Sequence, residues 1–382
     1  MQKKVLIISN FHEDASISRS NMAFNYFLKK GYDPIVLYSN FSHSLKKFRE
    51  LDNERFIALS TIAYSSSLSI NRIVSYFIFG YKVFKFLSKN TYDIVYINLP
   101  PNIIGLSVLL RKSKYSKLIV DIIDLWPESY PNNNNLIKKI ILYLSGIIPK
   151  MIRKRTIDYC DFCITESEFF HKELNLKNKR NSKVIYIKKF QTVLPVFEDL
   201  SKEMSIIYLG NIGVIYDFES LFKILKEVDK TRKIELHILG LGPLSDWLFE
   251  NLKTHDIKYH YHGASFDESL KREVISKCWF GFNGYKDNTE VALSYKSVDY
   301  LSYGVPLINS AKEDTEHIVN VEKIGYNFKA DSLNTIVHEL SKISVDEVLK
   351  MKKNSYTTFQ NKFSGRSYLR DMDCVLSNVN NQ

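Results

Sequence analysis

A lysine and a carboxylate stand three residues apart in segment 294–306, which reads Ser-Tyr-Lys-Ser-Val-Asp-Tyr-Leu-Ser-Tyr-Gly-Val-Pro. Ser294 is typical of a helix N-cap and Gly304 of the residue just beyond a helix, so Lys296 is expected in the first helical turn. A cation there opposes the helix dipole at a cost of roughly 0.3–1 kcal/mol, and a bound anion would reverse the sign. Lys296 can therefore hold a phosphate and Asp299 ribose hydroxyls. The alternative is a plain i, i+3 ion pair between the two side chains.

Glycines lie in segment 208–213, Tyr-Leu-Gly-Asn-Ile-Gly, between a predicted strand and a predicted helix. Glycine lets the backbone approach a ligand closely, and the first N–H groups of a helix attract anions. A diphosphate suits such a turn, although glycines are also ordinary turn residues. The phosphate-contacting residues predicted on this basis are Gly210, Asn211 and Gly213.

Acids and a tryptophan follow another predicted strand, in segment 121–129, which reads Asp-Ile-Ile-Asp-Leu-Trp-Pro-Glu-Ser. Parallel α/β sheets bind ligands at the carboxyl ends of their strands. There Trp126 can stack on a sugar face while carboxylates bind hydroxyls. The alternative is a helix start with Pro127 at its first position and Glu128 in its first turn, which leaves the tryptophan unexplained.

The elements that must position these residues are short apolar runs alternating with amphipathic stretches. Such alternation predicts parallel sheets joined by right-handed helical crossovers. Segment 192–202, which contains Pro195 and has no periodicity, reads as a linker between two doubly wound lobes with a ligand cleft between them. The predicted strands are 5–9, 34–38, 94–97, 118–122, 162–165 and 183–187 in the first lobe, and 205–209, 233–239, 257–261, 279–283 and 305–309 in the second.

Segment 294–306 resembles the nucleotide-binding region of GT-B glycosyltransferases of the family 4 type, in the variant found in polysaccharide pathways. Segment 208–213 resembles that branch's Tyr-x-Gly-Asn-x-Gly, segment 239–243 its Gly-x-Gly-Pro, and segment 261–263 the strand end before the base-binding loop. Segment 124–129, Asp-Leu-Trp-Pro-Glu-Ser, resembles bacterial capsule and O-antigen transferases.

The resemblance implies a GT-B fold of two Rossmann-like lobes with an interlobe cleft. The N-terminal acceptor-binding domain would span 1–195, the nucleotide-sugar-binding domain 196–365, and a C-terminal helix and tail, 366–382, would pack back on the first lobe. The implied enzyme is a retaining hexosyltransferase of the EC 2.4 class. It would use a nucleotide-diphosphate sugar, with uridine as the expected base and guanosine as the other candidate, and a polysaccharide or lipid-linked oligosaccharide acceptor. No further cofactor is implied.

Residue roles follow from the same resemblance. Asp299 matches the second acid of the family's Glu-x7-Glu pattern, whose first acid would fall at Val291, so that Glu290 is the nearest carboxylate. The loop after the first strand closes over both substrates in the family. The implied catalytic residues are Lys296, Asp124 and Glu290. The implied donor contacts are Gly210, Asn211, Gly213, Gly240, Ser294, Lys296 and Asp299, and the implied acceptor and cleft residues are His12, Ser16, Arg19, Trp126 and Glu128.

No metal site is expected. The Asp-x-Asp at 371–373 reads as a solvated helix face. Cys160 and Cys163, expected on opposite faces of one strand, read as structural rather than metal-binding or redox-active.

The composition and charge of the chain limit the kinds of partner it can bind. The 382-residue chain carries a net charge of +11, which favours an anionic partner such as a sugar nucleotide or anionic lipid. Zinc spacings and RNA-recognition signatures are absent, which argues against nucleic acid. Stretches 73–89 and 136–155 combine lysines with apolar residues, which fits either an anionic membrane surface or packing on the sheet.

We expect a cytoplasmic protein that can rest on the inner face of the membrane. The start of the chain reads as no signal peptide, the four cysteines form no disulfide framework, and no apolar run is long enough to span a membrane. Two alternatives share the fold. One is a sugar-nucleotide epimerase, whose Gly-Thr-Arg-Pro-Glu opening is absent, and the other is an inactive transferase-like partner protein.

Overall fold

The computed structural model describes residues 2–13, 18–66, 69–128, 136–190, 194–195, 197, 200–264 and 267–381, with the backbone alone described for 136–144. Two compact units divide the chain. Unit 1 contains residues 1–186 and 369–382, and unit 2 contains 187–368. The predicted boundaries lie at 195 and 365, near the points where the chain leaves unit 1 and returns to it.

Unit 1 is built on a seven-stranded sheet in the order β5-β2-β1-β6-β7-β8-β9, in which every neighbouring pair is parallel. The central strands are almost continuously apolar because helices cover both faces, and residues 5–8 of β1 are fully buried. The strands are β1 (Lys4–Ser9), β2 (Asp33–Ser39), β5 (Phe56–Leu59), β6 (Tyr92–Leu99), β7 (Tyr115–Ile122), β8 (Phe162–Thr165) and β9 (Ser182–Val184), beside a short antiparallel pair, β3 (Phe41–Ser42) and β4 (Lys47–Phe48).

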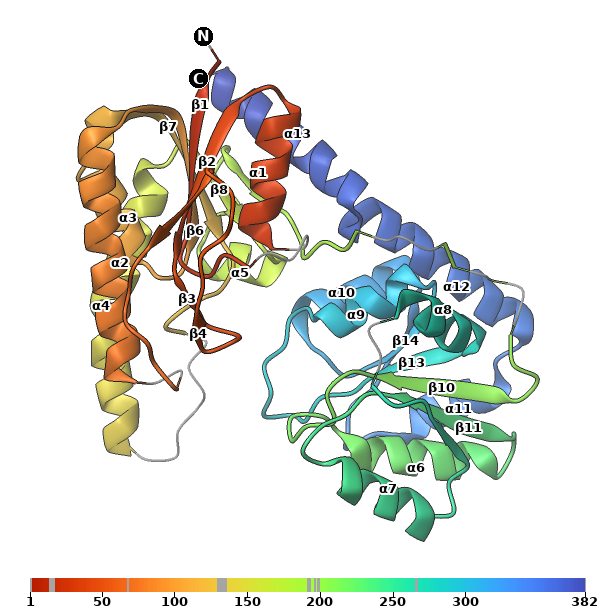
Figure 1. Ribbon diagram of the computed structural model, residues 1–382. Helices are drawn as coiled ribbons and strands as arrows, with labels where there is room; N and C mark the ends of the chain where they lie inside the picture. The colour runs from red at the N-terminus through yellow and green to blue at the C-terminus, as the bar shows by residue number, and fades with distance from the viewer. Residues whose placement is uncertain are drawn as a thin grey trace. The chain divides into compact units, whose positions relative to one another are not determined.

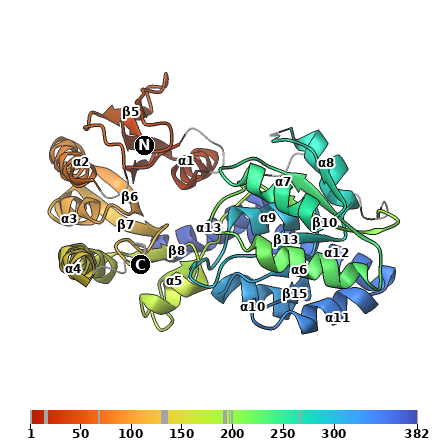
Figure 2. The ribbon, with the colours of Figure 1, turned by 90° about the horizontal axis from the view of Figure 1, so that it is seen from below.

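Helices α2, α3 and α4 cover one face of this sheet, and α1 and α13 lie on the other (Figures 1 and 2). Serine hydroxyls at 18, 69 and 167 accept backbone N–H groups at the first turns of α1, α2 and α5. The helices are α1 (Arg19–Lys29), α2 (Ile70–Lys89), α3 (Ile103–Leu109), the 3-10 turn η1 (Lys112–Lys114), α4 (Leu136–Tyr159), α5 (Glu168–Glu173) and α13 (Gly365–Asn380), which belongs to unit 1 from residue 369 onward.

Unit 2 repeats the pattern with a six-stranded parallel sheet in the order β12-β11-β10-β13-β14-β15. Figures 1 and 2 show α6, α7 and α11 on one face and α8, α9 and α10 on the other. The strands are β10 (Met204–Leu209), β11 (Ile234–Leu239), β12 (Tyr259–Tyr261), β13 (Phe280–Asn283), β14 (Leu307–Asn309) and β15 (Gly325–Asn327). The helices are α6 (Phe218–Asp229), α7 (Ser245–Thr254), α8 (Glu268–Lys277), α9 (Tyr295–Ser302), α10 (Glu313–Glu322), α11 (Asn334–Lys342), α12 (Val345–Thr358) and the π-turn η2 (Phe359–Phe363).

The predicted architecture of two parallel α/β sheets is confirmed. Two smaller expectations are wrong in part. Cys160 lies between α4 and β8 rather than on the strand that holds Cys163, and its thiol donates to the Ile157 carbonyl at 3.1 Å. Of the two carboxylates expected on a solvated helix face, Asp373 is exposed (47%) and Asp371 is not. Asp371 is buried, 3.4 Å from Lys183 Nζ, and Asp373 accepts a hydrogen bond from Tyr26 of α1.

Candidate functional site

A buried lysine without an acceptor lies at the carboxyl edge of the unit 2 sheet. Lys296 is 8% exposed, and no acceptor among the described residues lies within hydrogen-bonding distance of its Nζ. The Nζ atom instead lies 3.9 Å from the ring centre of Tyr208 and 3.6 Å from that of Tyr216. Ring faces attract a cation but accept none of its three N–H donors in the way an oxygen does. Burial holds the pKa of Lys296 well below its ordinary value.

The first glycine turn lies directly beside this lysine. A Cβ placed on Gly210, whose φ is +103°, would lie 3.8 Å from Lys296 Cε. Among the described residues, the N–H groups of Asn211 and Gly213 donate to no acceptor. The turn and the lysine therefore present unsatisfied donors next to each other, as a phosphate group requires.

A second glycine turn supports the first. A Cβ on Gly240 would lie 1.9 Å from the carbonyl oxygen of Gly210, and one on Gly242 would lie 2.4 Å from that of Ile212. The backbone of the first turn thus occupies the space that side chains would need. Because Gly240 has no side chain, the first turn can pack directly against it.

The expected helix N-terminus at residues 211–213 is wrong. Helix α6 begins at Phe218, and its N-cap Asp217 uses its own carboxylate to accept the N–H of Ser220 at 3.0 Å. The positive end of that helix is therefore already neutralised. Lys296 and the N–H groups of the turn remain as the source of positive potential.

Helix α9 is held over the sheet edge by residues that the sequence analysis missed. The buried hydroxyl of Tyr300 donates toward the carbonyl of Ile207 at 3.0 Å and accepts the N–H of Leu209 at 2.8 Å, and so ties the helix to β10. Gly281 makes room for this ring, because a Cβ there would lie 2.6 Å from it. Tyr300 follows Lys296 by four residues, so both point from the same helix face toward the sheet.

A ladder of side-chain amides, from Asn283, Asn309 and Asn327, fixes the ends of three strands beside α9. Asn283 donates to Asn309 at 2.7 Å, and Asn309 donates to Asn327 at 2.7 Å. These three residues are register partners in β13, β14 and β15. The ladder reaches the helix at Ser294, whose hydroxyl lies 3.5 Å from the Asn283 side-chain oxygen.

The caps predicted for α9 are present. The Ser294 hydroxyl accepts the N–H of Ser297 at 3.1 Å, and Gly304, with φ of +67°, follows the C-cap Tyr303. The sequence signals for these caps are local, which is why they could be read from spacing alone.

Asp299 does not pair with Lys296, so the i, i+3 alternative is wrong. Its carboxylate lies 2.8 Å from Lys189 Nζ, which also contacts Glu268 at 3.6 Å. Glu290 is exposed in the loop between β13 and α9 and forms no ion pair with the described residues. Lys189 and Glu268 had no motif to mark them, since their partners are distant in sequence.

In unit 1, the predicted cleft residue Arg19 is engaged in a buried ion pair. Its guanidinium contacts both carboxylate oxygens of Asp121, at 2.7 and 3.0 Å, and donates to the Ile185 carbonyl at 2.9 Å. Tyr96 and Asn98 donate to the same carboxylate. Contact between Arg19 and a phosphate would require this buried pair to open, which is costly.

Other acceptor candidates have mixed environments. His12 is 2% exposed, and its Nδ1 lies 2.7 Å from the Ser20 hydroxyl. Ser16 lies outside the described residues. Trp126 is half-buried, with its ring edge-on to Tyr76 at 6.0 Å.

Glu128 is paired with Arg153 of α4, and Nη1 of that residue also donates to the Trp126 carbonyl at 3.0 Å. Partial burial alone would raise the pKa of Glu128, but the hydrogen bond and charge of Arg153 outweigh it and lower the value. The alternative of a helix starting at Pro127 is wrong, because this residue lies in a turn and α4 begins at Leu136.

Glu166 is a further carboxylate at the same sheet edge, directly after β8, and was missed. Burial raises its pKa to about 7, and the charges of Asp121 and Asp124 add to this while Arg19 opposes it. Glu166 could have been predicted from its position just beyond a predicted strand, because Asp124 was chosen for its similar position beyond β7.

Comparisons with known proteins show the fold. No family model matches the chain, and no curated protein matches it in sequence. Among solved structures, sucrose-phosphate synthase from Thermosynechococcus elongatus matches with a TM-score of 0.67 at 13% identity over 98% of each chain. A glycosyltransferase from Rickettsia africae matches with 0.66 at 15% identity over 100% of each.

Anabaena HepE, solved in complex with UDP-glucose, matches with a TM-score of 0.64 at 10% identity, over 98% of this chain and 100% of that one. Together these matches show that the chain has the GT-B fold, which confirms the predicted fold class. No described helix combines the length and the apolar character needed to cross a membrane.

Proposed function

We propose that the chain is a retaining glycosyltransferase that moves a hexose-type sugar from a nucleotide-diphosphate sugar to a polysaccharide or lipid-linked oligosaccharide acceptor. The observation that carries this is the buried Lys296 ammonium, which lacks an oxygen acceptor and lies against the Gly210 turn. A departing nucleoside diphosphate would supply the missing acceptors. Stabilising charge on a leaving group with fixed donors is often the largest contribution to catalysis.

In this proposal the donor lies at the carboxyl edge of the unit 2 sheet. The diphosphate contacts Lys296 and the N–H groups of Asn211 and Gly213. Ser294, the N-cap of the helix that carries Lys296, also contacts the donor. The ribose binds Asp299, whose carboxylate is 30% exposed despite its pairing with Lys189. Glu290, exposed in the adjacent loop, serves the transferring sugar. Gly240 acts indirectly, by shaping the first turn.

Uridine is the base we propose, because HepE was solved with UDP-glucose and with UDP, and S. aureus TarM with UDP. WaaB, a lipopolysaccharide outer core galactosyltransferase, has the same fold with a TM-score of 0.62 at 13% identity. These neighbours support a hexose donor and a surface-polysaccharide acceptor. For the acceptor we propose Asp124, Trp126 and Glu128 of unit 1.

An exposed apolar surface on unit 1 supports a lipid-linked acceptor, because such a surface can rest on a membrane. Phe79, Val83 and Leu87 of α2 are fully buried against the sheet, so packing explains one face of this helix. Its outer face leaves five large apolar residues exposed, which packing does not explain: Ile70 (78%), Ile73 (41%), Val74 (40%), Phe77 (59%) and Tyr81 (57%). Lys82 and Lys85 lie on the same helix and favour anionic lipid.

Vesicle flotation tests this surface. The wild-type chain is expected to float with vesicles containing phosphatidylglycerol and less with neutral ones, and Phe77→Ser/Tyr81→Ser is expected to weaken flotation several-fold. Leu45→Ser, which changes another exposed apolar residue, is the control. Equal flotation of wild type and the double variant would show that this surface does not bind membranes.

The function itself is tested with the full chain and a panel of UDP-, GDP- and ADP-sugars. A donor that binds is expected to raise the unfolding midpoint. At a donor concentration a hundred times its dissociation constant, the free energy of unfolding should increase by about 2.7 kcal/mol. Release of UDP that increases with added acceptor, and a product anomer matching the donor, would support retaining transfer. Epimerised sugar nucleotide without UDP release would indicate the epimerase, and binding without any conversion would indicate an inactive partner. Failure of every nucleotide to bind would refute the proposal.

A further inference from the structure

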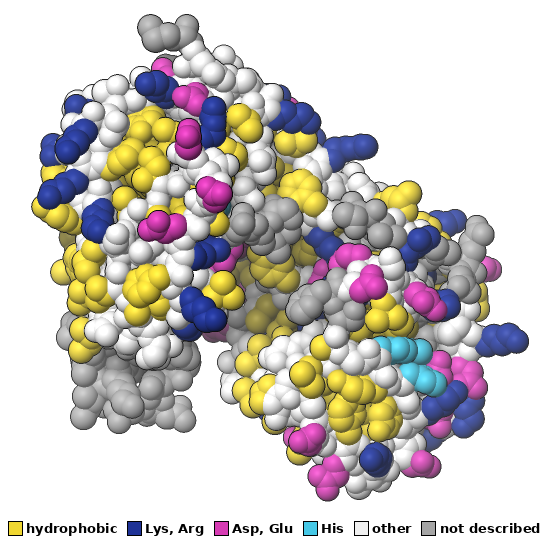
Figure 3. Space-filling view, viewed as in Figure 1, with side chains coloured by type: hydrophobic (Ala, Val, Ile, Leu, Met, Phe, Trp, Pro, Cys, Tyr) yellow, Lys and Arg dark blue, Asp and Glu magenta, His cyan; other side chains and the backbone are white. Residues whose placement is uncertain are grey.

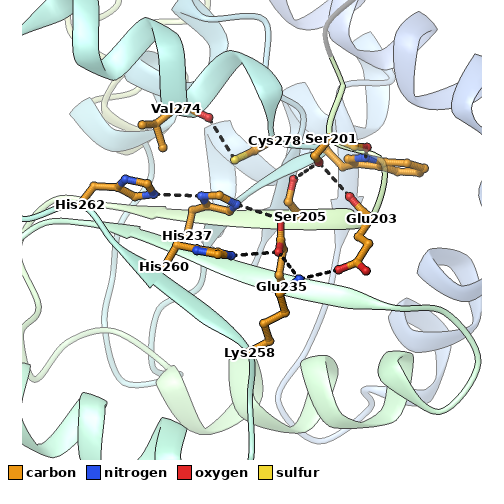
Figure 4. Close-up of polar contacts among 11 residues, drawn as sticks. Ser201, Glu203, Ser205, Glu235, His237, Lys258, His260, His262, Val274 and Cys278 are labelled. Carbon is orange, nitrogen blue, oxygen red and sulfur yellow. Dashed lines mark hydrogen bonds and ion pairs between the residues drawn. The ribbon is translucent and has the colours of Figure 1, made fainter.

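A cluster of histidines and one glutamate lies at the edge of the unit 2 sheet, on strands β11 and β12 (Figure 4). Glu235 and His237 are two residues apart on β11 and so share one face of the sheet. His260 is the register partner of His237 on β12. His262 follows at the end of that strand. The other face of β11, with Leu236 and Ile238, belongs to the hydrophobic core.

The side chains of this cluster converge on the Glu235 carboxylate. His237 Nε2 lies 3.2 Å from one carboxylate oxygen, and His260 Nε2 lies 3.0 Å from the other. One ligand atom from each of these three residues can be chosen so that all lie within 4.8 Å of one another. The Glu235 carboxylate is 12% exposed and the His260 side chain 46%. Glu235 is therefore nearly buried, whereas an ion could reach the cluster from solvent at His260.

We propose that Glu235, His237 and His260 bind one divalent first-row transition-metal ion, with zinc as the reference ion. Two imidazoles and one carboxylate are a donor set that zinc uses, with water in the remaining position. Tetrahedral ligands at zinc distances lie about 3.3 Å apart, close to the separations from Glu235 seen here. The rings of His237 and His260 stack with their centres 4.9 Å apart, so both would turn toward the ion when it binds.

A neighbouring histidine, His262, can orient one of the three proposed ligands. His237 Nδ1 lies 3.0 Å from His262 Nε2, and the two rings are parallel, with an interplanar angle of 4°. A histidine that binds metal through one ring nitrogen usually donates the other N–H to a neighbour, which orients the ring. His262 supplies that acceptor for His237.

One group competes with the metal. Lys258 Nζ lies 2.9 Å from a Glu235 oxygen and 2.8 Å from Glu203. This lysine is 56% exposed and can swing into solvent, but its charge opposes a cation at the same carboxylate. Removing it should therefore strengthen metal binding, an effect that a damaged fold would not produce. Histidines gather beside acidic and basic side chains in one exposed patch of the surface (Figure 3).

The bound ion would join the three-residue edge strand β12 to β11. The N–H of Gly240, at the end of β11, donates to the Gly263 carbonyl just beyond β12 at 2.9 Å, so the ion would also steady this loop. The inference stands whether or not the chain transfers a sugar, because none of the three proposed metal ligands belongs to the proposed donor site.

Equilibrium dialysis of Zn²⁺ against the full chain tests the site. We expect one tightly bound ion per chain, about tenfold or more weaker binding in His260→Ala, and weaker binding also in His262→Ala. Lys258→Gln should bind severalfold more tightly than wild type. His317→Ala, which removes an exposed histidine elsewhere in unit 2, should bind as wild type does.

Hydrogen exchange supplies a second readout. Zn²⁺ should slow amide exchange in residues 257–264 of the wild type and not in His260→Ala. Unchanged affinity in His260→Ala, an equal loss in His317→Ala, or no gain in Lys258→Gln would each overturn the assignment.

Discussion

The ammonium group of Lys296 costs stability in the free protein, because it is buried without an oxygen acceptor. A buried unsatisfied group typically destabilises by about 1–3 kcal/mol, and more if it is charged. The rings of Tyr208 and Tyr216 offset part of that cost through cation–π contact. Such a cost is expected where a residue is retained for a ligand rather than for the fold.

Lys296→Met tests this trade-off at a single residue. Methionine keeps the volume and removes the charge, so turnover should fall by about 10² to 10³. The unfolding free energy at neutral pH should at the same time rise by about 1–3 kcal/mol. Steady-state kinetics and chemical denaturation of the same preparation measure both. Near-normal turnover, or a less stable variant, would contradict the role assigned to this lysine.

Glu166 makes unit 1 sensitive to pH. Its folded pKa of about 7 lies above the ordinary value of 4.5, because burial disfavours the charged form. The folded state thus binds this proton more tightly than the unfolded state does. The corresponding stability is complete below pH 4.5 and is lost as pH rises through 7.

Glu166→Gln should therefore stabilise the protein above pH 7, by up to about 3 kcal/mol, and have little effect near pH 4.5. Denaturation at pH 5, 6, 7 and 8 measures the difference. Glu173→Gln, at an exposed carboxylate on the neighbouring helix, is the control. A constant offset between wild type and Glu166→Gln across this range would show that the residue does not titrate as stated.

Single residues of the site were predictable only where their signal is local. Ser294, Lys296 and Gly304 follow from the spacing of helix caps in one short segment. The pairing of Asp299 with Lys189 and of Arg19 with Asp121 could not be predicted, since each joins residues about a hundred positions apart. Sequence spacing carries no information about which distant charges meet.

Two glycine turns, after β10 and after β11, form one element of the candidate site because their backbones touch. Gly240→Ala would place a methyl group 1.9 Å from the Gly210 carbonyl, and neither atom belongs to a flexible side chain. We expect a loss of about 1–3 kcal/mol or more and loss of nucleotide binding.

Thermal unfolding and nucleotide-induced shifts measure this prediction. Gly31→Asn is the control, because Gly31 has a φ of +82° with no atom within 4 Å of a Cβ, and asparagine tolerates that conformation. Wild-type nucleotide binding by Gly240→Ala would show that the second turn does not support the first.

Strands were predictable where the apolar run is long and both faces are covered. The run at the start of the chain predicted β1, and Phe162–Thr165 was predicted with its observed bounds. Strands β5 and β15 were missed because they lie at the edges of their sheets, and β15 has only three residues, all partly exposed. Short edge strands depend on their neighbours more than on their own sequence.

At the scale of the whole chain, unit 1 is made of two segments far apart in sequence. Its second segment, the end of α13, buries four apolar residues, each worth about 1.5–3 kcal/mol when fully buried. These residues are Met372, Val375, Leu376 and Val379.

Deleting residues 369–382 should therefore destabilise unit 1 and leave unit 2 folded. Amides of α1 should lose protection from hydrogen exchange, while those of β10 and β13 keep theirs. Asp373→Asn is the mild control, since its partly exposed ion pair with Lys30 is worth only about 0–1 kcal/mol. Unchanged protection of α1 in the truncated chain would show that unit 1 is complete without this segment.

This divided arrangement also orders the events on the ribosome. The residues of unit 2 leave the exit tunnel as one uninterrupted stretch, whereas the last piece of unit 1 is translated after all of them. Unit 1 is thus begun first and completed only after unit 2, and its hydrophobic surface stays uncovered until residues 369–382 have emerged. A nascent chain stalled before residue 369 should bind chaperones through its N-terminal half.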